Sequence, residues 1–576
     1  MHIDDASRQY LTSGGERRVS RCYLLRRSYR DQNGKPRNET LANLSALPDH
    51  VIEALGKMLK GAALVDAEAA LEVERPVPHG NAAAAHVMAR KLGLEKLLGP
   101  PGRQRDIACA LVLSRAGRPC SKLSTARWWQ GGDTTLAEDF GLAGCSADDV
   151  YAAMDWLVSR QKDIEKQLAA RHLSPGGIAM FDLSSSWMEG SACELADFGH
   201  SRDGKRGRRQ IEYGLLTDPG GRPAAVEVFK GSTSDAVSFT TAVTRVRDHF
   251  GIGEMITAGD RGMITKTRIS DLRELPGMDW ITALKAPAIA ALARDGGPLQ
   301  MSLFDTQNLA GITHPDYPGE RLICCHSPFL AAERARKRQA LPAATEAEPA
   351  KIAASVQAGR LKDPDKIGVR TGKVINKNRA GKHFITDTGE GSFTFRRDAE
   401  KIAAEAASDG IYVIRTSVSE EILGSADTVA ACKNLKHVER DFRITKIDDL
   451  DLRPIYHYLG DRVRAHVLIC MLACYLTWHM REALAELTFT DQGIPRPYAP
   501  VAPAQRSYQA KAKDAARQTR GGLPVCRYKD LLGHLSTLSR QVINFSGQRT
   551  EKLTNPTPVQ ARAFELLGAP VPLTLR

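Results

Sequence analysis

Aromatic residues, paired cysteines and long apolar runs are all scarce in this chain of 576 residues. Aromatics make up only 6%, which gives no sign of a carbohydrate-binding or cage-type surface. The eleven cysteines are an odd number and include no C-x-x-C pair, which argues against a zinc or disulfide framework and fits a reducing cytosol. The most apolar stretch, residues 467–478, is short enough to predict a buried core helix and no membrane span. The first residues, from Met1 to Arg8, lack the apolar core of a signal peptide, so we expect a protein that is not exported.

Basic side chains are in excess. Lys and Arg number 80 against 67 Asp and Glu, which gives a formal net charge of +13. This balance favours a polyanionic partner such as nucleic acid, although a solvated basic surface has the same composition. The length itself predicts three or four domains.

The first third of the chain divides into two parts. Residues 1–75 predict a small α+β module, with a strand, a polar turn at 31–36, a second strand and a helix that begins after 47–49. Residues 76–173 show helical periodicity over 83–98, 105–115, 122–129 and 147–172. This helical domain carries Arg115, Arg118, Lys122 and Arg127. It is either a DNA-binding unit or a packing domain with a solvated basic face.

Strands and helices alternate from residue 174. Three consecutive strands are predicted at 178–183, 211–217 and 224–229, then a helix over 235–250, a strand at 255–258, a helix to about 275 and a strand at 280–284. This order predicts an α/β fold with a ribonuclease-H-like catalytic core, whose first part spans 174–285.

The core pattern is interrupted over residues 286–410, which we predict to be an inserted α+β subdomain. Within it, 331–359 is either a helix or partly disordered, and strand-like runs occur at 368–375, 382–386 and 392–395. The core resumes over 411–490 with a strand at 411–416, helices from Ser425 and an apolar helix over 462–487. Residues 491–576 form a C-terminal tail with short helical pieces such as 559–567.

Three acidic residues are candidates for a metal site. Asp182 and Asp260 each end an apolar strand-like run, and Glu439 lies on a predicted helix. Strand ends converge in a folded sheet, and Mg²⁺ prefers carboxylate oxygens, so these residues could hold two metal ions for phosphoryl transfer on DNA. Any one of them could equally be a solvated or capping residue. Glu439 could also form an i,i+4 ion pair with Arg443.

Basic residues accompany these acids. Glu439 and Lys446 are about two helical turns apart, so they are predicted to share a helix face with Arg443 between them. Arg443 is a candidate phosphate contact or an ion-pair partner of Glu439 or Asp441. Arg261, beside Asp260, is a further candidate phosphate contact. The densest basic cluster follows the first core strand, and it would either track a DNA backbone or form a solvated loop; its residues are Lys205, Arg206, Arg208 and Arg209.

These motifs resemble the DDE transposases of bacterial insertion sequences, in the branch with a β-rich insertion between the second Asp and the Glu. The resemblance covers roughly residues 18–487, and the long interval between Asp260 and Glu439 leaves room for the insertion. The matching segments, in order, are 181–187, 199–203 with 210–216, 228–235 with 258–263, and 438–446 with 452–457. The family signature also places a Tyr and an Arg ahead of the Glu. Those positions are Cys432 and Leu435 here, so two contacts to the DNA end are missing.

The resemblance implies a function and a set of partners. Asp182, Asp260 and Glu439 would bind two Mg²⁺ ions, with Mn²⁺ able to substitute, for attack by water and then by the 3′-hydroxyl of the element end. Lys446 would bind a phosphate near the cut. The partner would be double-stranded DNA, at the terminal inverted repeats of the element and at the target, bound by a homodimer in the bacterial cytoplasm and associated with the nucleoid. The alternatives are a structure-selective nuclease on the same core and a DNA-binding protein whose catalysis has decayed.

Overall fold

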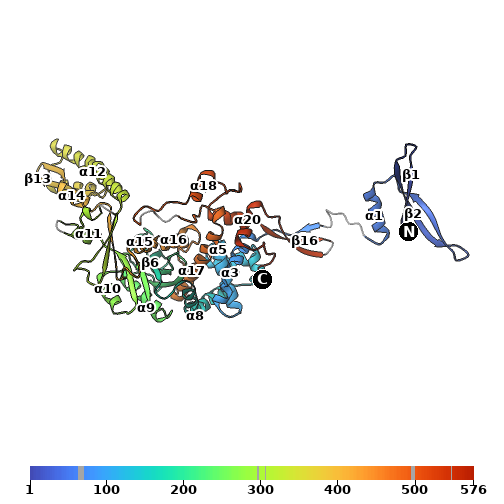
Figure 1. Ribbon diagram of the computed structural model, residues 1–576, viewed down its shortest axis with the longest axis horizontal. Helices are drawn as coiled ribbons and strands as arrows, with labels where there is room; N and C mark the ends of the chain where they lie inside the picture. Colours follow the sequence, from blue (N-terminus) through green and yellow to red (C-terminus); the bar gives the residue numbers. More distant parts are fainter. Residues whose placement is uncertain (63–70, 295–296, 305–306, 495–499, 546–547) are drawn as a thin grey trace. The chain divides into compact units, whose positions relative to one another are not determined.

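The computed structural model describes residues 1–62, 71–294, 297–304, 307–494, 500–545 and 548–576 (Figure 1). The chain divides into two compact units. The first comprises Met1–Pro76 with Arg540–Thr554, and the second comprises Val77–Ser539 with Asn555–Arg576.

In its described residues, the first unit contains an antiparallel sheet of order β1-β2-β3 and the helix α1, with bounds β1 His2–Leu11, β2 Arg17–Arg30, β3 Pro36–Asn43 and α1 Asp49–Leu59. The predicted strands, the turn and the helix of this module are confirmed. The turn is fixed by Asp31, whose side chain accepts hydrogen bonds from the backbone N–H groups of Asn33 and Lys35. Strand β1 was not predicted, because its mostly exposed polar residues give no alternation of apolar side chains.

The first unit also contains a β-hairpin from the C-terminal part of the chain. Strands β16 Ser539–Phe545 and β17 Gln548–Leu553 pair with each other, and β16 also pairs with β4 Leu71–Val73. Residues more than 450 positions apart in sequence thus meet in one small sheet.

The second unit begins with the helical domain. Its helices are α3 Gly80–Leu92, α4 Leu94–Leu98, α5 Arg103–Gly117, α6 Lys122–Gln130, α7 Thr135–Asp139 and α8 Ala147–His172. The predicted helices are confirmed, and α8 starts with a capping box between Ser146 and Asp149. The basic residues do not form one solvated face. Arg118 and Arg127 are exposed, whereas Arg115 and Lys122 are each only 4% exposed.

A mixed sheet of eight strands forms the centre of the second unit, in the order β11-β12-β15-β10-β9-β6-β7-β8. The strands are β6 Ile178–Trp187, β7 Gln210–Thr217, β8 Pro223–Lys230, β9 Met255–Gly259, β10 Met278–Ala283, β11 Leu309–Ile312, β12 Arg321–His326 and β15 Ile411–Thr416. Strands β6, β7 and β8 are antiparallel neighbours, whereas β6, β9 and β10 run parallel. The predicted strands are confirmed. In addition β11 and β12, within the range assigned to the insertion, extend this sheet.

Helices cover both faces of the sheet, and β6 shows how its residues alternate between them. Ala179, Phe181 and Leu183 pack with residues of α9 Asp235–Asp248 and α10 Lys266–Arg273. Met180 packs into the other core, with α15 Ser425–Lys433, α16 Leu435–Arg443 and α17 Gly460–Ala483. Successive strand residues point to opposite faces, so Asp182 lies on the Met180 face, the one covered by α16.

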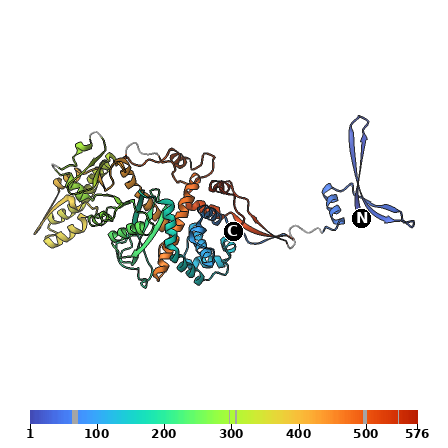
Figure 2. The same cartoon turned by 60° about the horizontal axis from the view of Figure 1, so that its bottom comes forward.

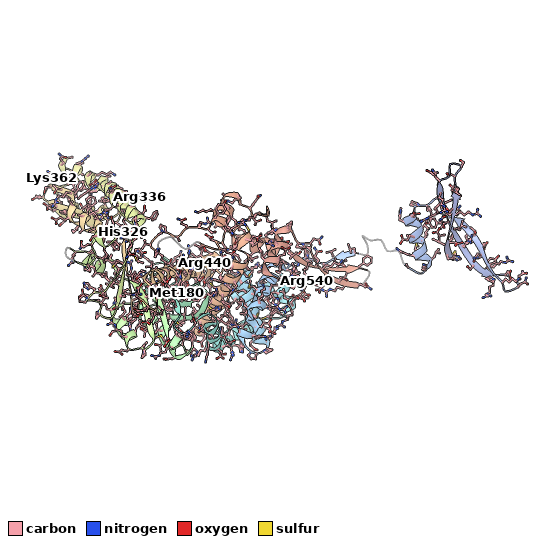
Figure 3. All side chains as sticks on the ribbon, viewed as in Figure 1. Met180, His326, Arg336, Lys362, Arg440 and Arg540 are labelled. Atoms are coloured by element: carbon pink, nitrogen blue, oxygen red, sulfur yellow. The ribbon has the colours of Figure 1, made fainter. Side chains whose placement is uncertain are left out.

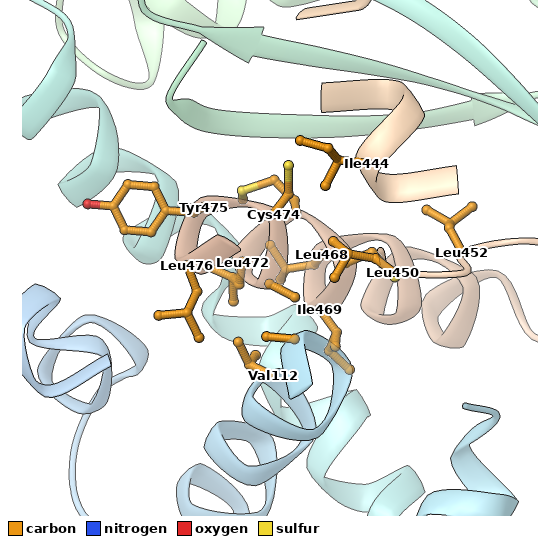
Figure 4. Close-up of a cluster of buried hydrophobic side chains, with 14 of the residues drawn as sticks. Val112, Ile444, Leu450, Leu452, Leu468, Ile469, Leu472, Cys474, Tyr475 and Leu476 are labelled. Carbon is orange, nitrogen blue, oxygen red and sulfur yellow. The ribbon is translucent and has the colours of Figure 1, made fainter. Parts of the chain in front are cut away.

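Helix α17 is the central element of the larger core. Figure 2 shows this orange helix between the green and teal strands and the blue helices. By length and composition α17 could cross a membrane, but 83% of its apolar window is buried within the protein. Figure 4 shows why: Leu468, Ile469 and Leu472 on α17 pack against Val112 on α5 and against Leu450. The prediction of a buried core helix is confirmed.

The insertion differs in part from the prediction. Its elements are α12 Pro328–Gln357, α13 Pro364–Ile375, β13 Phe384–Gly389, β14 Ser392–Arg397 and α14 Ala399–Ala406. The segment 331–359 is helical, the first of the two alternatives. The strand-like run at 368–375 was predicted wrongly, because it lies in α13. The Asp363 side chain accepts hydrogen bonds from two N–H groups at the start of α13 and Pro364 occupies its first turn, which are both strong signals for a helix.

The C-terminal segment contributes to the larger core. It forms α18 Tyr508–Ala516, α19 Tyr528–Ser536 and α20 Pro558–Leu567, the last as predicted. Leu531, Leu535 and Phe564 are buried in the same core as α17. These residues therefore belong to the packed part of the second unit.

Candidate functional site

Asp182 lies in the middle of β6, and Asp260 directly follows the end of the neighbouring parallel strand β9. In the pairing of β6 with β9, Phe181 is opposite Gly259. Asp182 and Asp260 are the next residue on each strand path, which places their backbones side by side. Asp260 begins a turn in which its carboxylate accepts a hydrogen bond from the Gly262 N–H at 3.3 Å. The prediction that Asp182 ends its strand is wrong, because β6 continues to Trp187 in its pairing with β7. The predicted proximity of the two aspartates is consistent with the register, since the pairing of β6 with β9 stops just before them.

Glu439 reaches the same region from α16, which packs over β6 and β7. Val438 and Phe442 are buried on the sheet side of this helix, and Phe442 meets Tyr213 of β7 edge to face at 5.7 Å between ring centres. Glu439 is exposed. In Figure 3, Met180 on β6 and Arg440 on α16 mark the two elements that bring these acids together.

The other two carboxylates of the cluster affect Asp182 electrostatically. Burial raises the pKa of Asp182 to about 7, and the negative charges of Asp260 and Glu439 act in the same direction. The Leu183 N–H, which donates to the Asp182 carboxylate at 2.8 Å, and the Arg202 guanidinium partly oppose this shift of the pKa. An acidic group that is buried beside two like charges is a place where a bound cation would be favourable.

The donor chemistry of this cluster suits a hard cation, since all three residues offer carboxylate oxygens. The three side chains do not form the coordination shell of one ion. Across the part of the chain that the structure describes, there is no group of three or more His, Cys, Asp or Glu residues placed to hold one metal ion. Asp182, Asp260 and Glu439 are therefore close enough to affect the pKa of Asp182 but do not form such a group.

Cys432 lies beside the candidate site. Burial raises the pKa of its thiol to about 11, and the charge of Asp260 adds to this effect. The family signature has a tyrosine at this position, so the neutral thiol replaces a larger polar side chain next to the second aspartate.

Lys446 differs from the prediction of a shared helix face. Helix α16 ends at Arg443, and Ile444–Asp448 form a π-helical turn, which changes the angular spacing of the side chains. The Lys446 side chain is buried and its ammonium group binds the buried Asp203 carboxylate at 2.9 Å. Arg453 binds the same carboxylate. The charge of Lys446 is thus neutralised by Asp203, in the loop after β6. Lys446 is buried, whereas Glu439 and Arg443 are exposed, so the three residues do not share one exposed helix face.

Arg443 was predicted to contact a phosphate or to form an ion pair with Glu439 or Asp441. Among the described residues, no ion pair joins Arg443 to Glu439 or to Asp441. Asp441 is buried on the opposite side of the helix, where burial raises its pKa well above the ordinary value. The exposed guanidinium of Arg443 therefore does not form the ion pair with Glu439 or Asp441 that was one of its two predicted roles.

Arg202 is a further residue of this site that sequence reasoning did not single out. Its guanidinium binds Asp235 at 2.6 Å and lies 3.6 Å from Glu212. Its charge also partly opposes the rise in the pKa of Asp182. The available signal was its place in the segment 199–203, which carries part of the family resemblance.

The basic loop after β6 is largely exposed, as either alternative requires. Lys205 and Arg208 lie over the ring of Trp187, at 5.8 and 5.2 Å from its centre. Arg208 also pairs with Glu189 at 2.8 Å, and Arg209 lies over Phe198. Arg206 is fully on the surface side of the loop, and Arg261 is likewise exposed next to Asp260.

Comparison with known proteins found one family model and a solved structure that are similar to parts of the chain. Residues 12–71 match the sequence model of the IS1634 family transposase, N-terminal domain. The match supports a transposase. A solved structure, described as a cryo-EM structure of the piggyBac transposase synaptic complex with hairpin DNA, is similar over 69% of this chain and 72% of that chain, at 8% identity and a TM-score of 0.33. No curated protein matches the sequence.

Proposed function

We propose that this chain is an insertion-sequence DDE transposase with a ribonuclease-H-like core, which binds the terminal inverted repeats of its element and catalyses metal-dependent cleavage and strand transfer. The observation that carries the proposal is the placement of Asp182 on β6 beside Asp260, which directly follows the parallel strand β9, with the helix of Glu439 packed over the same sheet. The N-terminal family match supports the transposase class independently of these acids.

Asp182, Asp260 and Glu439 would hold two Mg²⁺ ions. Such ions, when bound, stabilise the negative charge on the attacking and leaving oxygens of a phosphodiester. The protein itself contributes one aspartate on β6, a second aspartate directly after β9 and an exposed glutamate on α16. Arg202 forms an ion pair with Asp235, and its positive charge partly offsets the negative charge around Asp182.

Cleavage and joining of a supercoiled plasmid that carries the element ends would test this function. With Mg²⁺ and the full-length protein, we expect excised element and strand-joined products. Products that are cut but never joined would instead indicate the structure-selective nuclease. Binding without any cutting would indicate the decayed DNA-binding protein, the candidate favoured by Cys432, by Leu435 and by the neutralised Lys446.

The basic loop would contact the DNA backbone in this proposal. We expect Arg206→Ala to weaken binding about equally for all DNA sequences, because a phosphate contact carries no sequence information. The slope of log K against log salt concentration should decrease by about 0.9 for this one lost contact. Fluorescence anisotropy of a labelled duplex over a range of salt concentrations would measure it.

Lys166→Ala is the matched control, since Lys166 is an exposed cation on α8. It removes the same charge at a position outside the loop. An unchanged slope in Arg206→Ala, or an equal change in Lys166→Ala, would mean that residues 205–209 are a solvated loop.

A further inference from the structure

A cavity of about 660 Å³ lies beside the start of α6, apart from the three acids. Its walls come from α5, α6, α8, α17 and the loop over residues 451–457. The residues that matter most for its chemistry are Arg115, Lys122, Tyr151, Arg453, His457 and His466. The lining of the cavity therefore includes three cationic side chains and two histidines.

Two of these cations are buried without a carboxylate partner. Lys122 and Arg115 are each 4% exposed. Arg115 donates to the carbonyl oxygen of Leu450 at 3.1 Å, and the Lys122 ammonium lies 3.3 Å from Nδ1 of His466. Neither partner is charged. Among the described residues no ion pair satisfies Lys122 or Arg115, and buried cations in proteins are normally paired with an anion.

His466 cannot supply the missing negative charge, and its hydrogen bonds define its state. Its Nε2 lies 2.9 Å from the Leu452 carbonyl oxygen, to which it must donate, so Nδ1 is left to accept from Lys122. Burial and the charges of Lys122 and Arg115 hold the pKa of His466 well below its ordinary value. Burial, with Arg115 second, lowers the pKa of Lys122 to about 7. An anion in the cavity would relieve both effects.

The rim of the cavity provides hydroxyl groups at a helix N-terminus. Ser121 caps α6 by accepting from the Ser124 N–H at 3.1 Å, and both residues line the cavity. Arg453, which also lines the cavity, pairs with Asp203. The one acidic side chain in the lining, Asp451, is exposed, and its charge is not among those that shift the pKa of Lys122.

We propose that this cavity binds a phosphate group, held by Lys122 and Arg115 with Arg453 and the serine hydroxyls of the α6 cap around it. Point-like and planar cations together with hydroxyl donors are the usual partners of phosphate oxygens. The phosphate could belong to a DNA strand or to a small free compound. The DNA source rests on the proposed function, whereas the phosphate chemistry rests only on the cavity.

Isothermal titration of the full-length protein with inorganic phosphate tests the chemistry. Lys122→Met keeps the length of the side chain and removes its charge. We expect it to weaken phosphate binding at least tenfold, because it removes one of the two buried cationic donors. Lys166→Met, the same substitution on the exposed face of α8, should leave the affinity unchanged.

A second variant guards against misfolding of the first. Ser124→Asp places a negative charge at the rim and suits the third residue of a helix, so it should leave α6 intact while repelling phosphate. Far-UV circular dichroism reports the fold of both variants. If Lys122→Met does not fold, the phosphate affinity of Ser124→Asp tests the proposal in its place.

The salt dependence of duplex binding then separates the two sources. A slope reduced by about 0.9 in Lys122→Met assigns the phosphate to a DNA strand. Weakened phosphate binding with an unchanged slope assigns it to a small compound. Phosphate affinity that neither variant alters, or no phosphate binding together with an unchanged slope, overturns the proposal. DNA cleavage is not measured in these assays, so they stand whether or not the chain cuts DNA.

Discussion

Glu439→Gln is expected to abolish cleavage of DNA carrying the element ends, by a factor on the order of 10³ or more, while the protein still binds the same DNA. The carboxylate is exposed on α16, so its loss should not disturb the buried contacts of Val438 and Phe442 that hold the helix. Gln keeps the shape and removes the negative charge that a divalent cation requires. Cleavage on a gel and binding by anisotropy, in the same buffer, measure the two effects separately.

The matched control for this variant is Glu400→Gln, at an exposed position in the first turn of α14. It makes the same chemical change on another helix and should cut DNA at the wild-type rate. Substantial cleavage by Glu439→Gln would remove Glu439 from the site and leave the two aspartates without their proposed third ligand. Loss of binding together with cleavage would indicate a folding defect instead.

The core elements were predictable because their signals are local. The strand that carries Asp182 and the strand that precedes Asp260 both contain short apolar runs, and their burial in the sheet produces that pattern. The sequence did not show that β6 continues beyond Asp182, because its next residues are the polar Ser184, Ser185 and Ser186. Helix α17 was predictable from the apolar stretch at residues 467–478. The run at 368–375 misled the prediction because Val369, Val374 and Ile375 favour strands, whereas the cap at Asp363 and the buried Ile367 and Thr371, four residues apart, specify a helix.

The state of Lys446 shows what local patterns cannot give. The sequence places Lys446 two turns after Glu439, and this spacing alone predicts a shared face. The π turn at Ile444–Asp448 changes the spacing, and Asp203, 243 residues away in sequence, takes the ammonium group as its partner. A contact across that distance depends on the sheet that brings β6 under α16. The buried cations of the cavity at α6 escaped prediction for the same reason, since Arg115 and Lys122 look like ordinary basic surface residues in the sequence.

The paired Lys446 also bears on catalysis. If Lys446 is to hold a DNA phosphate, as the family resemblance implies, the phosphate must compete with Asp203 for the ammonium group. Arg453 binds the same carboxylate and lines the cavity at α6. A phosphate on Arg453 would leave Asp203 with Lys446 alone, so the two cations are linked through one acid.

Asp182→Asn is expected to make the metal-free protein more stable than wild type at pH 8. In the folded protein the pKa of Asp182 is raised to about 7, first by burial and then by Asp260 and Glu439, from an ordinary value of 3.8. Between about pH 4 and pH 7 the folded state therefore keeps a proton that the unfolded chain has lost. The free energy of unfolding of wild type must fall as the pH rises through this window, and it stays low above pH 7.

The Asn side chain has no proton to lose, and it can still accept the hydrogen bond from the Leu183 N–H. Each unit of pKa shift corresponds to about 1.4 kcal/mol, so the variant should gain on the order of a few kcal/mol over wild type at pH 8 and little at pH 4. Urea unfolding at the two pH values, without divalent ions, measures the difference. A difference that does not grow from pH 4 to pH 8 would mean that the Asp182 carboxylate is not destabilised in the folded state.

Added Mg²⁺ should reverse the order of the two proteins. An ion that binds only the folded state stabilises it by about 2.7 kcal/mol at a concentration one hundred times its Kd. Wild type should therefore gain stability with Mg²⁺ at pH 8, whereas Asp182→Asn, which lacks one of the proposed ligands, should gain much less. The destabilising charge at Asp182 is then the same property that binds the ion, and a site that costs stability when empty is what a function acting through a bound cation would select. Equal stabilisation of both proteins by Mg²⁺ would place the ion elsewhere.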